Sequence, residues 1–236
     1  MEHKRPASGS LAMLRHTLPD RRAVLLAACA CWLGFALLVA LVLSGGAEAF
    51  DAAGLVLWRT ADGMPRGPGW LEEGVRDLTG LGGVTLRNAA ALVAAAVLLH
   101  LRRGRAAAFV VLTVGGGWAF NTGLKLLFGR DRPDLVTPLM EAGGPGFPSG
   151  HAFNGTVVWL AIALAFVPLA ATRLGRVSLV WGAMLLTPAI AWSRVWLGVH
   201  YPSDVLAGWL GGAGWTLLAW AVLLTARQAR SEPPAA

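Results

Sequence analysis

The chain has 236 residues, of which 56% are hydrophobic and only 14% are charged. This balance excludes an ordinary soluble domain and is typical of an integral membrane protein. The formal net charge of +7 would suit a nucleic-acid-binding protein, but the arginines fall in short clusters between apolar runs and form no continuous basic face. We therefore expect no nucleic-acid partner. Cys29 and Cys31, one residue apart in an apolar run, cannot crosslink distant loops.

The first apolar run predicts a membrane span. Residues 1–22 are polar and basic, and residues 23–43 are uncharged over roughly the 20 residues that cross a bilayer. A secretory signal peptide is the alternative, because residues 47–49 read Ala-Glu-Ala and resemble a cleavage site. The apolar run exceeds the roughly 7 to 15 residues of a signal-peptide core. We expect a retained span preceded by a cytoplasmic segment, residues 1–22.

The next stretch, residues 45–83, is polar and glycine-rich and predicts a loop outside the membrane. Two pieces of it, residues 50–58 and 70–81, mix Trp and Leu with charge, as interfacial helices do. They could guide a lipid toward a site, but packing against the headgroup layer is the simpler interpretation.

Five further apolar runs bring the predicted number of transmembrane helices to six, in an all-α polytopic membrane protein with one helical bundle. They cover residues 84–101, 106–124, 153–171, 177–191 and 205–225. We expect one membrane domain, residues 23–226, and a cytoplasmic tail, residues 227–236. With six spans, the arginine clusters all fall on one side, which is cytoplasmic by the positive-inside rule. The loop 45–83 and the stretches 125–150 and 193–204 fall on the other side.

The stretch 193–204 places a histidine, an arginine and an aspartate at the mouth of the last span. Pro202 suits the first turn of a helix, so His200 should lie just outside a helix N-terminus. Asp204, four residues after His200, can hold one ring nitrogen and leave the other free to attack. The helix N-terminus favours an anion over His200, and phosphate is the obvious candidate.

Two other stretches lie at the same membrane face. Lys125, Arg130 and Arg132 follow the third span, where cations by themselves would only anchor a helix at the headgroups. Ser149 and the following glycine precede the fourth span. There Ser149 can cap the helix while backbone N–H groups form a cradle for anionic oxygens. A capped helix start does not explain His151.

The histidines, the aspartate and the cations of these three stretches together suit phosphoryl transfer. Phosphoryl transfer needs an in-line nucleophile, neutralisation of the phosphate charge and a proton for the leaving oxygen. A zinc site built from His151, His200 and Asp204 is the alternative, but the surrounding lysine and arginines would repel a dication. We expect a metal-free site with no cofactor.

The three stretches resemble the tripartite signature of the type-2 phosphatidic acid phosphatase superfamily, K-x6-RP, PSGH and SR-x5-H-x3-D. Soluble vanadium-dependent haloperoxidases share this signature, but six spans argue against a haloperoxidase here. Every signature position is filled in order, by Lys125, Arg132 and Pro133, by Pro148, Ser149, Gly150 and His151, and by Ser193, Arg194, His200 and Asp204.

The resemblance implies a role for each residue. His200 would be the nucleophile that forms a phosphohistidine, Asp204 would orient it, and His151 would be the acid for the leaving group and then the base for water. Arg130 lies outside the strict signature and is a second-tier candidate for a second phosphate or the headgroup. The phosphate oxygens would be held by Lys125, Arg132, Ser149, Gly150 and Arg194.

The resemblance also implies a phosphatase of the bacterial plasma membrane that acts at the outer leaflet on a lipid phosphate or diphosphate. Candidate substrates are undecaprenyl diphosphate, phosphatidylglycerol phosphate, phosphatidic acid and lipid A phosphates. We favour the first, because such carriers present a diphosphate at that face. A phosphotransferase between lipids that uses the same intermediate remains open. A transporter or scramblase is disfavoured, since the spans carry few ionisable residues away from the outer mouth. We infer no obligatory protein partner.

Overall fold

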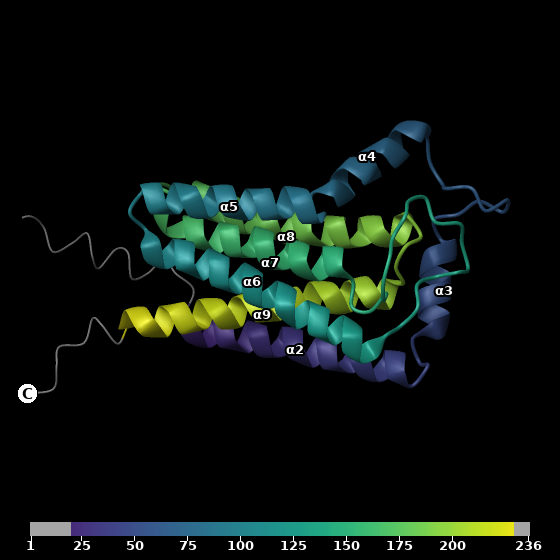
Figure 1. The fold of residues 1–236 in the computed structure, drawn as a ribbon, viewed down its shortest axis with the longest axis horizontal. Coiled ribbons are helices and arrows are strands. Elements are labelled where there is room, and N and C mark those ends of the chain that lie inside the picture. The colour runs from purple at the N-terminus through teal and green to yellow at the C-terminus, as the bar shows by residue number, and fades with distance from the viewer. Residues whose placement is uncertain (1–19, 229–236) are drawn as a thin grey trace, which may run out of the picture.

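Residues 20–228 are described by a computed structural model and form helices joined by loops, with no β-strand in that range (Figure 1). Five helices are long and apolar enough to cross a membrane, and α4 and α5, bent by 48° relative to each other, add a sixth candidate span. The protein is an all-α polytopic membrane protein, as predicted. The helices are α2 (Arg21–Leu43), α3 (Glu48–Val56), α4 (Gly69–Gly80), α5 (Val84–His100), α6 (Gly104–Phe128), α7 (Gly150–Phe166), the 3-10 turn η1 (Val167–Leu169), α8 (Arg173–Trp196) and α9 (Pro202–Gln228).

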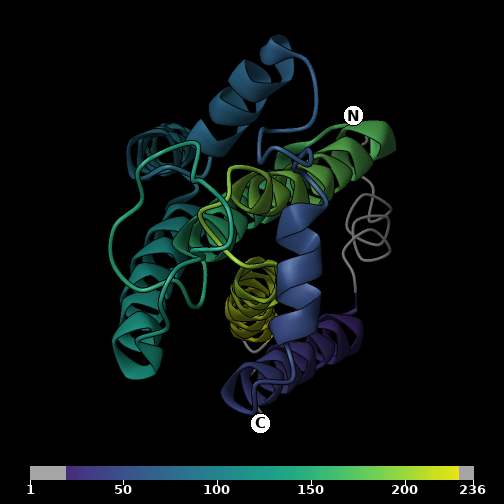
Figure 2. The same cartoon turned by 90° about the vertical axis from the view of Figure 1, so that its right-hand side faces the viewer.

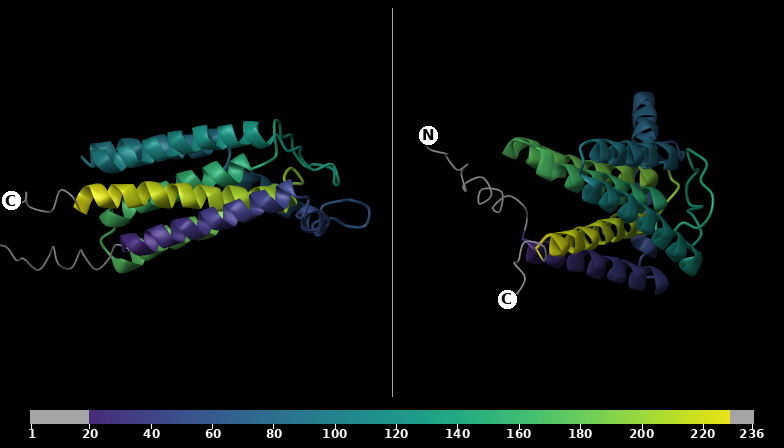
Figure 3. Two further views of the ribbon diagram at one scale, coloured as in Figure 1. Left: turned by 90° about the horizontal axis from the view of Figure 1, so that it is seen from below. Right: turned by 60° about the vertical axis from the view of Figure 1, so that its left-hand side comes forward.

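Helix α7 lies at the centre of the bundle. It is apolar on all sides, and 72% of its span is buried inside the protein, against 17% for α2. α9 packs closely on it, because a Cβ at Gly212 would lie only 2.4 Å from the carbonyl oxygen of Phe153. Within residues 20–228, the first and last helices, α2 and α9, run side by side (Figure 3). This packing brings the first turns of α7 and α9 together.

The two predicted interfacial pieces are helices and lie at one end of the bundle. α3 and α4 gather there with the loop 129–149 and the α8–α9 connection (Figure 1). Figure 2 looks onto this end and shows α3 beside the near end of α9. We call it the loop end.

The spans differ from the predicted ones at their loop ends. α6 continues past residue 124 to Phe128, α7 begins at Gly150, and α8 continues past residue 191 to Trp196. The prediction stopped where the apolar run stopped. Polar residues such as Lys125 and Arg194 interrupt the apolar runs there, but the helices continue past them, because these two side chains bind protein groups at the loop end. Lys125, Arg194 and Asp204 therefore occupy terminal helical turns, whereas Arg132 and His200 lie in the connections between helices.

Candidate active site

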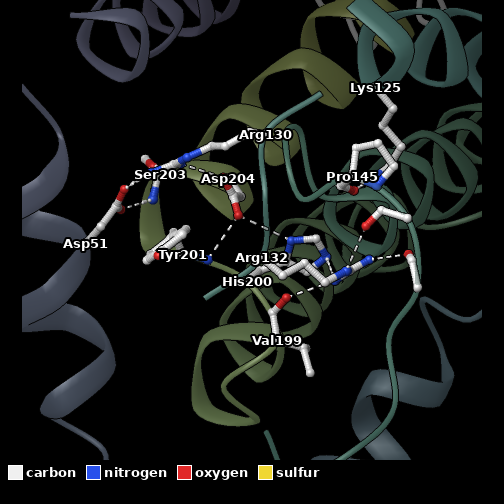
Figure 4. A network of polar contacts seen from close by, with 12 residues as sticks. Asp51, Lys125, Arg130, Arg132, Pro145, Val199, His200, Tyr201, Ser203 and Asp204 are labelled. Carbon is white, nitrogen blue, oxygen red and sulfur yellow. Dashed lines mark hydrogen bonds and ion pairs between the residues drawn. The ribbon is translucent and has the colours of Figure 1, made fainter. Parts of the chain in front are cut away.

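His200 and Asp204 form the pair that their spacing predicts. His200 lies in the turn between α8 and α9 and is only 1% exposed. Its Nδ1 is 3.3 Å from Asp204 Oδ2, and the backbone N–H of Tyr201 donates to the same oxygen over 3.0 Å (Figure 4). α9 begins at Pro202, as expected, which puts Asp204 in its first turn. The carboxylate thus faces one ring nitrogen and leaves the other uncovered by it.

Arg132 faces the second ring nitrogen. Its NH1 group lies 3.1 Å from His200 Nε2 and donates to the Val199 carbonyl over 2.8 Å. Because a guanidinium can only donate, Nε2 must accept, and the ring proton is on Nδ1 facing Asp204. Burial, and then the charges of nearby arginines and a lysine, place the pKa of His200 well below its usual range. The imidazole is therefore neutral, with a lone pair on Nε2.

Arg132 is fixed by the loop 129–149. Its Nε donates to the Gly144 carbonyl over 3.0 Å and its NH2 to the Gly143 carbonyl over 2.8 Å. Lys125, in the last turn of α6, donates to the Pro145 carbonyl of the same loop. The loop thus binds two cations of the first signature stretch, and one of them, Arg132, contacts the histidine.

Ser149 corrects one expectation. It occupies the N-cap position of α7, but its hydroxyl makes no capping hydrogen bond. The residue is fully buried, and Oγ has no partner among residues 20–228. Its backbone N–H donates instead to the backbone carbonyl of Asp204 over 3.0 Å, which ties α7 to α9. A buried hydroxyl without a partner is costly, so this group is available to a ligand.

Gly150 and His151 follow in the first turn of α7. A Cβ on Gly150 would lie in ordinary van der Waals contact with Lys125 Cε, at 3.5 Å, so this cation lies close to the helix N-terminus. His151 is partly exposed and packs against Gly82, where a Cβ would lie 3.3 Å from its Cδ2. Its imidazole has no hydrogen-bond partner within the described part of the chain, which leaves both ring nitrogens free for proton transfer.

Arg194 lies in the last turn of α8 and is 2% exposed. Its NH1 donates to Thr79 Oγ1 of α4 over 3.1 Å and lies 2.9 Å from Met140 Sδ. Its buried Nε has no partner within residues 20–228. Nothing in the sequence indicated that Thr79 belongs to the site, because it is far along the chain from every signature stretch.

Arg130, the second-tier candidate for a second phosphate, has other partners in the structure. Its NH1 and NH2 groups pair with Asp204 over 2.6 Å and with Asp51 over 2.7 Å. Sequence reasoning missed Asp51. One signal could have found it, because Asp51 precedes the apolar Leu55 by four residues and so shares the buried face of α3.

The described residues contain no group of three or more His, Cys, Asp or Glu side chains that could hold a metal ion. The site instead collects cations around the buried His200 and Asp204, an arrangement that suits a phosphate.

Residues 104–228 match the family model of the PAP2 superfamily. Phosphatidylglycerophosphatase B of Bacillus subtilis (strain 168) is 31% identical over 142 residues, which cover 59% of this chain and 68% of that protein. The chain belongs to the PAP2 superfamily. The fold agrees, because the crystal structure of a transmembrane PAP2-type phosphatidylglycerolphosphate phosphatase from Bacillus subtilis matches with a TM-score of 0.73. That match has 25% identity and covers 88% of this chain and 98% of the other.

A second relative of this PAP2 protein is the putative undecaprenyl-diphosphatase YbjG of Escherichia coli (strain K12). It is 46% identical over 90 residues, which cover 36% of this chain and 41% of that protein. A lipid A 4'-phosphatase of Bacteroides thetaiotaomicron is 34% identical over 125 residues, 48% of this chain and 52% of that protein. Family and relatives together identify this chain as a multi-pass membrane lipid phosphatase.

Proposed function

We propose that the protein hydrolyses a lipid phosphate or diphosphate at the outer leaflet of a bacterial plasma membrane through a phosphohistidine on His200. The observation that carries the proposal is the tautomer of His200, fixed by Asp204 on one side and Arg132 on the other. It leaves the Nε2 lone pair directed at the cationic cluster where a phosphate would bind.

The proposed reaction has two steps. His200 Nε2 attacks phosphorus, the bond to the leaving oxygen breaks, and His151 gives that oxygen a proton. Asp204 stabilises the positive charge that the ring then carries. Water next attacks the phosphohistidine while His151 takes its proton, the N–P bond breaks and inorganic phosphate leaves. The phosphate oxygens would be held by Lys125, Arg132, Ser149, Gly150 and Arg194.

Undecaprenyl diphosphate is the substrate we propose, with phosphatidylglycerol phosphate as its main competitor. One relative is named as a phosphatidylglycerophosphatase and another as an undecaprenyl-diphosphatase. Phosphate release by the purified protein should be measured over these two lipids, phosphatidic acid and a lipid A phosphate. The highest kcat/KM is expected for undecaprenyl diphosphate. Absence of release from every lipid would reject the proposed hydrolysis.

Activity should survive a chelator. In the proposed mechanism lysine and arginine side chains neutralise the phosphate charge, so no metal is required. Phosphate release in excess EDTA should equal that in its absence, and vanadate should inhibit, because its adduct on His200 imitates the transition state. Loss of activity in EDTA that Mg²⁺ or Zn²⁺ restores would reject a metal-free mechanism.

The loop end should face outward. The opposite end carries the arginine clusters, which the positive-inside rule assigns to the cytoplasm. Single cysteines at Gly69 and Gly143, in a background with Cys29 and Cys31 replaced by alanine, should react with an impermeant reagent in intact cells. A cysteine at Gly104 should react only after permeabilisation. At all three positions a Cβ would meet no other atom within 4 Å. The reverse labelling would place the site at the cytoplasmic face.

A further inference from the structure

A buried carboxylate outside the signature lies behind the catalytic pair. Asp51 of α3 is 1% exposed, although α3 lies at the end of the bundle. Its Oδ1 accepts from the backbone N–H of Ser203 over 2.8 Å, and its Oδ2 accepts from Ser203 Oγ over 2.6 Å. The same Oδ2 accepts from Arg130 NH2 over 2.7 Å (Figure 4). Asp51 therefore reaches from α3 into the first turn of α9.

Arg130 joins Asp51 to the catalytic aspartate. Its NH1 donates to Asp204 Oδ1 over 2.6 Å and to Ser203 Oγ over 2.8 Å, while NH2 binds Asp51. The Tyr201 ring lies beneath the guanidinium, 4.4 Å from Cζ to the ring centroid. The guanidinium is thus held on several sides and links two carboxylates that are 153 positions apart in the chain.

The position of α3 depends on one close contact. A Cβ on Gly54 would lie only 2.4 Å from Cγ of Pro202, so only glycine lets α3 approach the start of α9 this closely. Asp51 lies three residues before Gly54, nearly one helical turn away, and faces the same neighbour. This contact brings the Asp51 carboxylate within reach of Ser203.

We propose that Asp51 and Arg130 are positioning residues that, together with Ser203, fix the Asp204 carboxylate toward His200. The catalytic unit then extends beyond residues 104–228, the family match, to α3. This inference rests on the proposed function, in which His200 is the nucleophile.

The two oxygens of Asp204 have different partners. Arg130 occupies Oδ1, which leaves Oδ2 for His200 Nδ1 and the Tyr201 N–H. Without Arg130, Oδ1 would be a buried anionic oxygen without a strong donor, and the carboxylate could rotate away from the ring. Without Asp51, Arg130 would pair with Asp204 alone, and its charge would offset the carboxylate that stabilises the positive charge developing on His200. Asp51 thus lets Arg130 fix the geometry without this electrostatic cost.

The test is a double-mutant cycle. Asp51→Asn keeps the shape of the side chain and removes its charge. We expect kcat to fall about 10- to 100-fold, the range for lost outer-shell partners at metal sites, with KM unchanged because Asp51 does not touch the substrate. Arg130→Gln should lower kcat at least as much. The double variant should be no slower than Arg130→Gln alone, since Asp51 acts through Arg130.

The matched control is Glu48→Gln, which neutralises an exposed carboxylate on the same helix and should leave kcat unchanged. The loss in Asp51→Asn should be equal on alkyl and aryl phosphates, because the change affects the nucleophile and not the leaving group. Wild-type kcat in Asp51→Asn, or a double variant in which the two losses multiply, would overturn the proposal. So would a rise in KM alone.

Two further variants distinguish a folding defect, or a failure of the proposed function, from a failure of the positioning role. If Asp51→Asn does not fold, the Ser203→Ala variant tests the proposal in its place. It removes only the hydroxyl that bridges Asp51 and Arg130. A folded Ser203→Ala enzyme with lowered kcat and unchanged KM supports the proposal, and one with wild-type kcat overturns it. Activity that survives in His200→Ala would instead reject the proposed function itself.

Discussion

Replacing His200 with alanine should abolish phosphate release from every lipid phosphate, because the variant has no nitrogen to attack phosphorus. The loss should be on the order of 10⁶-fold in kcat, as when a protease loses its nucleophile. Quenching of the wild-type enzyme in alkaline detergent during turnover of a ³²P-labelled lipid, followed by alkaline gel electrophoresis, should show a labelled protein band that acid treatment removes. His200→Ala should show none.

The matched control for this variant is His100→Ala. His100 ends α5 at the opposite end of the bundle and is exposed. This variant should retain wild-type activity and the labelled band. Label that persists in His200→Ala would assign the intermediate to another residue.

Replacing His151 with alanine should have an effect that depends on the leaving group. The variant loses only the acid, at a cost of typically about 10²- to 10⁴-fold where the leaving oxygen needs a proton. An alkoxide leaves poorly without one. A phosphate leaving from a lipid diphosphate has a conjugate-acid pKa of roughly 6 and departs largely unaided. The loss should therefore be much larger on a lipid monophosphate than on a diphosphate or an aryl phosphate.

Single-turnover kinetics on matched substrates would measure this difference, provided that the chemical step is rate-limiting for each. His200→Ala is the comparison, because it should lose activity equally on all of them. Equal losses for His151→Ala across leaving groups would contradict the acid assignment and make His151 a phosphate-positioning residue.

The sequence predicted the helices and the His200–Asp204 pair for a physical reason. Length and hydropathy identify spans, and a spacing of four residues across a helix start determines which side chains meet. Hydropathy does not identify where a helix ends once its side chains face protein. For that reason the ends of α6 and α8, with Lys125 and Arg194 in their last turns, were placed too early.

Other parts of the site could not be predicted, because they depend on tertiary contacts. Ser149 stands at a position where a serine usually caps the helix. Its backbone N–H instead donates to the backbone carbonyl of Asp204, and its hydroxyl has no partner among the described residues. Arg130 lies beside a phosphate ligand of the signature in the sequence, but in the structure it binds Asp51, which comes close enough because α3 packs on Pro202. The roles of these residues depend on neighbours that are distant in the sequence.

The packing of α2 along α9 has a consequence for how the protein is made. Helices enter the membrane in the order of synthesis, so α2 is inserted long before α9, the neighbour it runs beside. Until α9 follows, Asp51 lacks both the N–H and the hydroxyl of Ser203. The site can therefore assemble only once α9 is in place, and a chain truncated before residue 202 should leave both α2 and Asp51 without these partners.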